Sequence, residues 1–110
     1  VTAIVFSTRQ PSHEDALSQR IARVTEWRQV AHLSDQELAQ DIAAAKVDIL
    51  IDMSGHTSKH RMGVFARKPA PMQMSWLGYV GTTGLPTMDY VIADRWHGPD
   101  GYALPGPEQL

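Results

Sequence analysis

The sequence has no cysteine, which excludes disulfide bonds and thiolate metal sites and fits a reducing compartment. It also has no apolar run near the roughly 20 residues that cross a bilayer, and its first residues lack the basic start of a signal peptide. We therefore expect a cytoplasmic protein without a membrane segment. A formal net charge of −2 argues against a nucleic-acid binder, which ordinarily has a basic surface.

Acidic residues are absent from positions 53 to 88, although acids are frequent just before that stretch. The same stretch holds the cations Lys59, Arg61, Arg67 and Lys68. A local excess of positive charge can attract an anionic ligand such as a nucleotide diphosphate. The same charges are also typical of a solvated basic surface, and charge alone favours that second interpretation.

The apolar periodicity predicts strands and helices in alternation. Strands are expected over 1–6, 27–31, 47–53, 72–77 and 90–93, and helices over 13–25, 34–46 and 59–67. Ser12 is the expected N-cap of the first helix. This order predicts an α/β fold, a Rossmann-like parallel sheet with helices on both faces. We expect residues 1–97 to form the later part of one lobe and residues 98–110 an irregular tail rich in glycine and proline.

The loops that follow the strands at 47–53 and 72–77 are the candidate ligand site, because ligands bind at the carboxyl ends of parallel strands. The first loop contains Gly55, His56 and Thr57, and the second contains Gly81 to Gly84. His56 suits either a ligand contact or a capped structural histidine. The second loop suits either a phosphate site or a plain turn, since it lacks the Lys-Ser/Thr ending of a P-loop.

A metal site is the third possibility, because Asp52, His56 and His60 follow one another at four-residue spacing. Such spacing brings ligands together only on a continuous helix, and Gly55 interrupts one here. The sequence therefore predicts no metal site. Trp76 and Phe65 are expected to pack in the core.

Five short elements occur together between Val47 and Asp94. They are Gly-His-Thr at 55–57, Arg-Lys-Pro-Ala-Pro at 67–71, Trp-Leu-Gly-Tyr at 76–79, Gly-Thr-Thr-Gly-Leu-Pro at 81–86 and Met-Asp-Tyr at 88–90. In order and spacing they resemble the catalytic region of the O-linked N-acetylglucosamine (O-GlcNAc) transferases and the plant SPINDLY proteins, glycosyltransferase family 41. One departure is Val80, which stands where the family has proline.

The resemblance implies a place in a larger enzyme. The family is of the GT-B type, with two Rossmann-like lobes, commonly behind a tetratricopeptide superhelix that recruits acceptors. This chain would be the later part of the first lobe. By resemblance, Leu77 and Gly78 line the donor-sugar pocket, and Gly55, His56 and Thr57 lie on its rim near the acceptor. No catalytic residue is expected within the chain, and the donor-binding lysine belongs to the second lobe.

The resemblance also implies the activity. We expect a fragment of a hexosyltransferase that moves N-acetylglucosamine from UDP-GlcNAc to serine and threonine residues of proteins, without a metal or cofactor. Its partners would be a nucleotide sugar and a protein acceptor, and the chain alone would be inactive. One alternative is a SPINDLY-type protein O-fucosyltransferase that uses GDP-fucose. Another is a non-catalytic α/β binding or scaffolding module.

Overall fold

A computed structural model of the chain describes residues 1–76, 79, 81–97 and 106–110. The chain divides into two compact units, residues 1–34 and 35–110. None of the helices described is long and apolar enough to cross a membrane.

The first unit is a βαβ arrangement. Strands β1 (Ile4–Ser7) and β2 (Glu26–Gln29) pair in parallel, and between them lie a 3₁₀ turn, η1 (Pro11–His13), and helix α1 (Ala16–Ala22). The predicted N-cap, Ser12, is wrong, because Ser12 lies inside the turn that Pro11 begins. Asp15 caps α1 instead, since its carboxylate accepts the amide proton of Ser18 at 2.9 Å.

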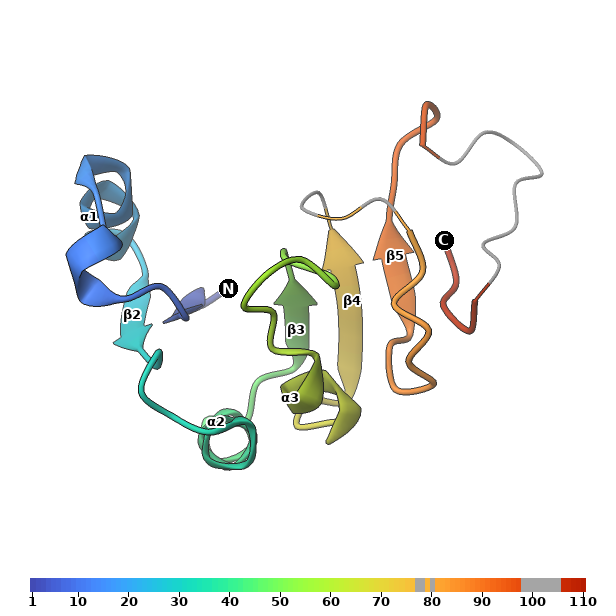
Figure 1. The fold of residues 1–110 in the computed structure, drawn as a ribbon, viewed down its shortest axis with the longest axis horizontal. Helices are drawn as coiled ribbons and strands as arrows, with labels where there is room; N and C mark the ends of the chain where they lie inside the picture. The colour runs from blue at the N-terminus through green and yellow to red at the C-terminus, as the bar shows by residue number, and fades with distance from the viewer. Residues whose placement is uncertain (77–78, 80, 98–105) are drawn as a thin grey trace. The chain divides into compact units, whose positions relative to one another are not determined.

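The second unit holds a three-stranded parallel sheet in the order β3-β4-β5. Its elements are α2 (Asp35–Ala44), β3 (Ile49–Asp52), α3 (Met62–Ala66), β4 (Met72–Trp76) and β5 (Tyr90–Ile92). The three strands point in the same direction (Figure 1). The predicted parallel α/β fold is confirmed, and each predicted strand and helix is present with shorter or shifted bounds.

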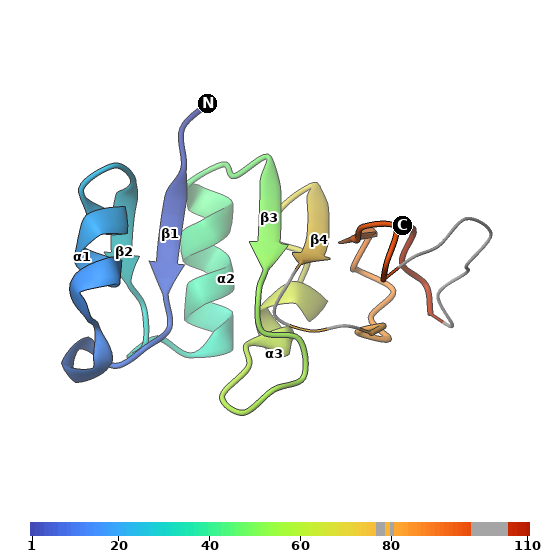
Figure 2. The ribbon, with the colours of Figure 1, turned by 90° about the horizontal axis from the view of Figure 1, so that it is seen from above.

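Helices α2 and α3 lie side by side in the second unit (Figures 1 and 2). A Cβ atom at Gly63 would lie 2.1 Å from Oδ2 of Asp35, so a side chain there would displace the Asp35 carboxylate. Arg61 Nε donates to the other oxygen of Asp35 at 2.7 Å. The buried apolar side chains of this unit include Leu38, Ile42, Leu50, Val64, Phe65, Met88 and Val91. The expected burial of Phe65 is therefore confirmed.

Strand β4 buries its polar face. Gln73 and Ser75 are 0% and 1% exposed, whereas Trp76 is 42% exposed, so the expected burial of Trp76 is wrong for the part of the chain described. Gln73 explains why the polar face of β4 is the buried one, because its Nε2 donates to the backbone carbonyls of Phe65 and Thr87, each at 2.9 Å. The opposite face carries the half-exposed apolar side chains Ile49, Ile51, Met72, Trp76, Tyr90 and Ile92.

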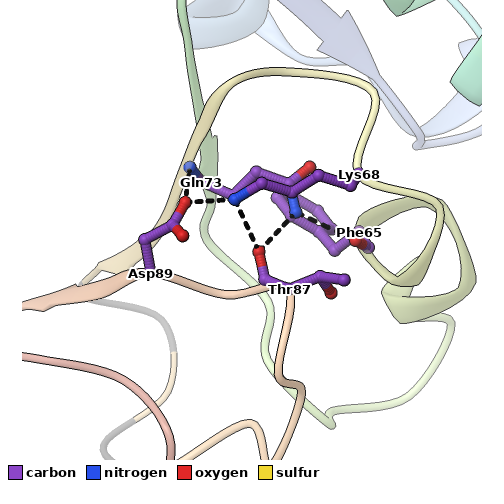
Figure 3. Close-up of polar contacts among 5 residues, drawn as sticks. All are labelled: Phe65, Lys68, Gln73, Thr87 and Asp89. Atoms are coloured by element: carbon purple, nitrogen blue, oxygen red, sulfur yellow. Dashed lines mark hydrogen bonds and ion pairs between the residues drawn. The ribbon is translucent and has the colours of Figure 1, made fainter.

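Lys68 and Asp89 form an ion pair beside Gln73 (Figure 3). The Lys68 ammonium also donates to the carbonyl of Thr87 at 3.0 Å, and the Asp89 carboxylate accepts the amide proton of Gln73 at 2.8 Å. The hydrogen bond from Lys68, followed by that from the Gln73 amide, holds the pKa of Asp89 below its ordinary value. These contacts fix the start of β5 against the start of β4.

We predict that Asp89→Asn lowers the free energy of unfolding by up to about 1 kcal/mol at neutral pH, since the ion pair is partly solvated. A folded-state pKa below the unfolded value gives stability that is present above the unfolded pKa and lost as the pH falls through the folded pKa. The loss should therefore be seen at pH 7 and shrink below the ordinary aspartate pKa of 3.8. Urea titrations at pH 7 and pH 3 measure it. Asp48→Asn, at an exposed aspartate before β3, is the control, and a loss that is equal at both pH values contradicts the prediction.

Candidate functional site

The loop after β3 turns sharply because of the last residue of that strand. Asp52 is buried, and its carboxylate accepts the amide protons of Ser54 at 3.2 Å and Gly55 at 2.6 Å. Gly55 has φ +55°, a left-handed conformation that favours glycine. Thr57 closes the turn, because its hydroxyl donates to the carbonyl of Ser54 at 2.7 Å.

Tyr79, from the loop after β4, packs directly on this turn. A Cβ atom on Gly55 would lie 2.1 Å from Cγ of Tyr79, so the ring needs a glycine beneath it. The Tyr79 ring also meets the His56 imidazole edge to face, with 5.8 Å between the ring centroids. The prediction that the two loops lie at the same edge of the sheet is therefore confirmed.

A hydrogen bond joins His56 to the second loop. His56 Nε2 lies 2.6 Å from the carbonyl oxygen of Thr83. A carbonyl only accepts, so the proton of the neutral ring is on Nε2, and Nδ1 keeps its lone pair. His56 is otherwise exposed. The arrangement can therefore offer a fixed acceptor nitrogen to a hydroxyl group.

The two predicted donor-sugar residues, Leu77 and Gly78, lie outside the described residues. Their role stays a prediction. Of the predicted rim residues, Gly55 and His56 contact the second loop, whereas Thr57 bonds within its own loop.

The second loop is organised by Glu108, which the sequence reasoning missed. The carboxylate of Glu108 accepts hydrogen bonds from the Thr82 hydroxyl and from both the amide and the hydroxyl of Thr83. Burial of Glu108 raises its pKa, but the hydrogen bonds from the two threonines outweigh burial, and the net pKa lies below the ordinary value. The donors of this loop, predicted to suit a phosphate or a plain turn, are thus directed at an internal carboxylate.

The end of the predicted irregular tail is attached to the sheet. Gln109 forms a parallel bridge with Tyr90, because Val91 donates to the Gln109 carbonyl at 2.7 Å and Gln109 donates to the Asp89 carbonyl at 2.8 Å. This bridge places Glu108 beside the second loop. Gly106 is required nearby, since a Cβ atom there would lie 1.8 Å from the Thr82 hydroxyl oxygen.

The three residues weighed as metal ligands are each used in protein hydrogen bonds. Asp52 binds two amides and His56 binds the Thr83 carbonyl, while Nδ1 of His60 accepts the amide proton of Met62 at 3.2 Å. Among the residues that the structure describes, no three His, Cys, Asp or Glu side chains gather as a metal site would require. Two of the four clustered cations, Arg61 and Lys68, pair with Asp35 and Asp89.

A hollow of about 290 Å³ lies elsewhere, at the amino-terminal ends of β4 and β5. It is lined by Pro71, Met72, Pro86, Met88, Asp89, Tyr90, Pro107 and Gln109. Ligands of parallel sheets bind at the opposite ends of the strands. We therefore place the candidate site at the two joined loops, at the carboxyl ends of β3 and β4, and not at this hollow.

Known proteins resemble the chain along most of its length. The sequence model of glycosyl transferase family 41 matches residues 7–109. A protein of Oryza sativa subsp. japonica, named as a probable UDP-N-acetylglucosamine–peptide N-acetylglucosaminyltransferase SPINDLY, is 42% identical over 76% of this chain and 9% of its own length. An Arabidopsis thaliana protein with the same enzyme name, SEC, is 38% identical over 78% of this chain and 10% of its own.

A solved structure is also similar. It is a mutant of the O-GlcNAc transferase of Thermobaculum terrenum, with a TM-score of 0.79 and 38% identity over 84% of this chain and 18% of that one. The chain thus spans about a tenth of the length of the two plant relatives, and under a fifth of the solved chain.

Proposed function

Because the chain belongs to glycosyl transferase family 41, we propose that it forms part of a protein O-GlcNAc transferase. Such an enzyme moves N-acetylglucosamine from UDP-GlcNAc onto serine and threonine hydroxyls of proteins. The observation that carries the proposal is the family match over residues 7–109. The enzyme names of the rice and Arabidopsis relatives support the donor and the acceptor.

We propose that this chain supplies one wall of the sugar site. Leu77 and Gly78 would face the donor sugar, and Gly55, His56 and Thr57 would form the rim toward the acceptor. The contact between His56 and Thr83 supports the rim, because it turns a ring nitrogen into a fixed hydroxyl acceptor. Both reactants of the transfer carry hydroxyl groups, so either can use such an acceptor.

The remaining chemistry is proposed to come from outside this chain. Sugar transfer from a diphosphate needs the leaving charge neutralised and the acceptor hydroxyl positioned. Arg61 and Lys68 are already paired with carboxylates, which supports a donor-binding lysine from a second lobe. We further propose that the whole enzyme acts in the cytoplasm, needs no metal, and recruits its acceptors through a tetratricopeptide superhelix.

The test is a transfer assay on the full-length parent protein with a serine- and threonine-containing peptide. We expect sugar transfer from UDP-GlcNAc at a rate that EDTA leaves unchanged, and no transfer by the 110-residue chain alone. GDP-fucose is the matched second donor, and its exclusive use would replace the proposed activity with protein O-fucosylation. Transfer from neither donor would favour the binding-module alternative.

A further inference from the structure

Glu108 connects to the candidate rim through one residue. Its carboxylate holds Thr83 by both the backbone amide and the side-chain hydroxyl. The carbonyl of the same Thr83 lies 2.6 Å from His56 Nε2. Glu108 and Thr83 are 5% and 4% exposed, so water competes little for these hydrogen bonds.

We propose that Glu108 is a positioning residue that fixes the His56 imidazole through Thr83. Charge-assisted hydrogen bonds are stronger than neutral ones, so the carboxylate restrains the Thr83 peptide more firmly than a neutral acceptor can. The restrained carbonyl holds the proton of the neutral ring on Nε2, which leaves Nδ1 as the acceptor nitrogen. The ligand this suits is a hydroxyl group of the donor sugar or of the protein acceptor.

The residues around Glu108 use both of its carboxylate oxygens and leave no room for a side chain at Gly106. Thr82 donates its hydroxyl to the second carboxylate oxygen, so both oxygens are used. The Thr82 hydroxyl also accepts the amide proton of Gly84 at 3.0 Å, which links the carboxylate to the next turn of the loop. A side chain at Gly106 would collide with both Thr82 and Glu108. The backbone therefore passes closely over a hydrogen-bonded carboxylate.

The first test is proton NMR of this chain. A histidine ring N–H proton exchanges with water too fast to be observed unless a hydrogen bond protects it. We expect a protected His56 Nε2–H signal in the wild type and in Glu108→Gln, which keeps one acceptor oxygen for Thr83, and loss of the signal in Glu108→Ala. Glu26→Ala, which removes an exposed carboxylate in the first unit, is the charge-matched control and should keep it.

A signal that survives in folded Glu108→Ala overturns the proposal. If that variant does not fold, Thr82→Val takes its place, because it leaves both hydrogen bonds from Thr83 to Glu108 intact. The signal should then persist, and its loss in folded Thr82→Val would overturn the proposal.

The second test measures the consequence in the full-length parent, and this part rests on the proposed function. We expect Glu108→Ala to raise KM by roughly five- to thirty-fold, the loss of one good hydrogen bond, with a smaller change in kcat. A rise in the KM of UDP-GlcNAc identifies the sugar hydroxyl, and a rise in the KM of the peptide identifies the acceptor hydroxyl.

A double-mutant cycle separates positioning from general destabilisation. If Glu108 acts through His56, Glu108→Ala should add little to His56→Ala, because the two variants remove the same contact. Additive losses would overturn the proposal. An inactive full-length parent would contradict the proposed function. It would not affect the NMR test, which measures the hydrogen bond from His56 to Thr83 and its dependence on Glu108.

Discussion

Gly55→Ala should lower the free energy of unfolding of this chain by about 2–4 kcal/mol, in two separable parts. An L residue in the left-handed region costs about 1–2 kcal/mol, and Gly55 has φ +55°. The rest comes from overpacking, because the new Cβ would lie 2.1 Å from Cγ and 2.2 Å from Cβ of Tyr79. These are the inner atoms of the side chain, so a rotation of the ring alone cannot relieve the collision.

Gly84→Ala is the matched control, because it isolates the first part. Gly84 has φ +72°, yet no atom described lies within 4 Å of the position its Cβ would take. It should therefore cost only about 1–2 kcal/mol. Urea titration of both variants gives the difference. Equal losses would show that Tyr79 does not pack on Gly55 in solution.

Removing the obstacle offers an independent check. Tyr79→Gly deletes the atoms that a Cβ on Gly55 would meet. In the double variant Gly55→Ala/Tyr79→Gly the steric part of the loss should disappear and the conformational part should remain. The double variant should therefore lose less stability than the two single variants added together. In the full-length parent, Gly55→Ala should also reduce sugar transfer, since His56 is the next residue along the turn.

The meeting of the two loops was predictable from the sequence, and the reason is general. Strong apolar runs at 47–53 and 72–77 identified two strands, and parallel strands bring their carboxyl ends to one edge. The glycine at position 55 marked the turn. The sequence could not show which atoms join the loops, because the bond from His56 to the Thr83 carbonyl depends on the conformation of a backbone 27 residues away.

Glu108 was missed because a single carboxylate carries no local signal. It follows a stretch rich in glycine and proline, which supported the prediction of an irregular tail. One signal was available, since positions 53–88 contain hydroxyl groups and cations but no acid. Buried donors need acceptors, so a region without its own carboxylates requires them from elsewhere, as Glu108 and Asp89 show.

Strand β4 shows why alternation alone can mislead. Its sequence, Met-Gln-Met-Ser-Trp, alternates apolar and polar residues, which predicts the apolar side chains inside. The structure places Gln73 inside, because its Nε2 donates to the carbonyl of Thr87 in the connection after β4 and to the carbonyl of Phe65 at the end of α3. These contacts arise from tertiary structure and leave no periodic mark.

The burial of Gln73 leads to the second large effect, that of Gln73→Glu. The two carbonyls fix the orientation of the amide, because its nitrogen must face them (Figure 3). Glutamate has the same shape but puts a charged oxygen where the donor was, against two carbonyl oxygens and without water. A buried charge without a matched partner costs about 3–5 kcal/mol, and the nearby Lys68 ammonium should hold the loss near the lower value, about 3 kcal/mol.

Gln73→Leu is the matched neutral control. It removes two hydrogen bonds, but it also removes Oε1, which is buried and meets no donor in the part of the chain described. These terms oppose each other, and Thr87 keeps Lys68 as a partner, so the net loss should be about 1 kcal/mol. A larger loss for leucine than for glutamate would contradict the assigned orientation of the Gln73 amide.

The pH dependence of Gln73→Glu gives a further, sign-specific result. Burial raises the folded-state pKa of the introduced carboxyl above its unfolded value of about 4.3. A raised folded pKa means that the deficit is smallest below the unfolded pKa and grows as the pH rises through the folded pKa. The free-energy gap to wild type should therefore be widest at pH 7 and narrow toward pH 4, whereas the gap for Gln73→Leu should stay constant. Urea titrations of the three proteins at both pH values decide it, because a glutamate deficit independent of pH would mean that the side chain escapes to solvent.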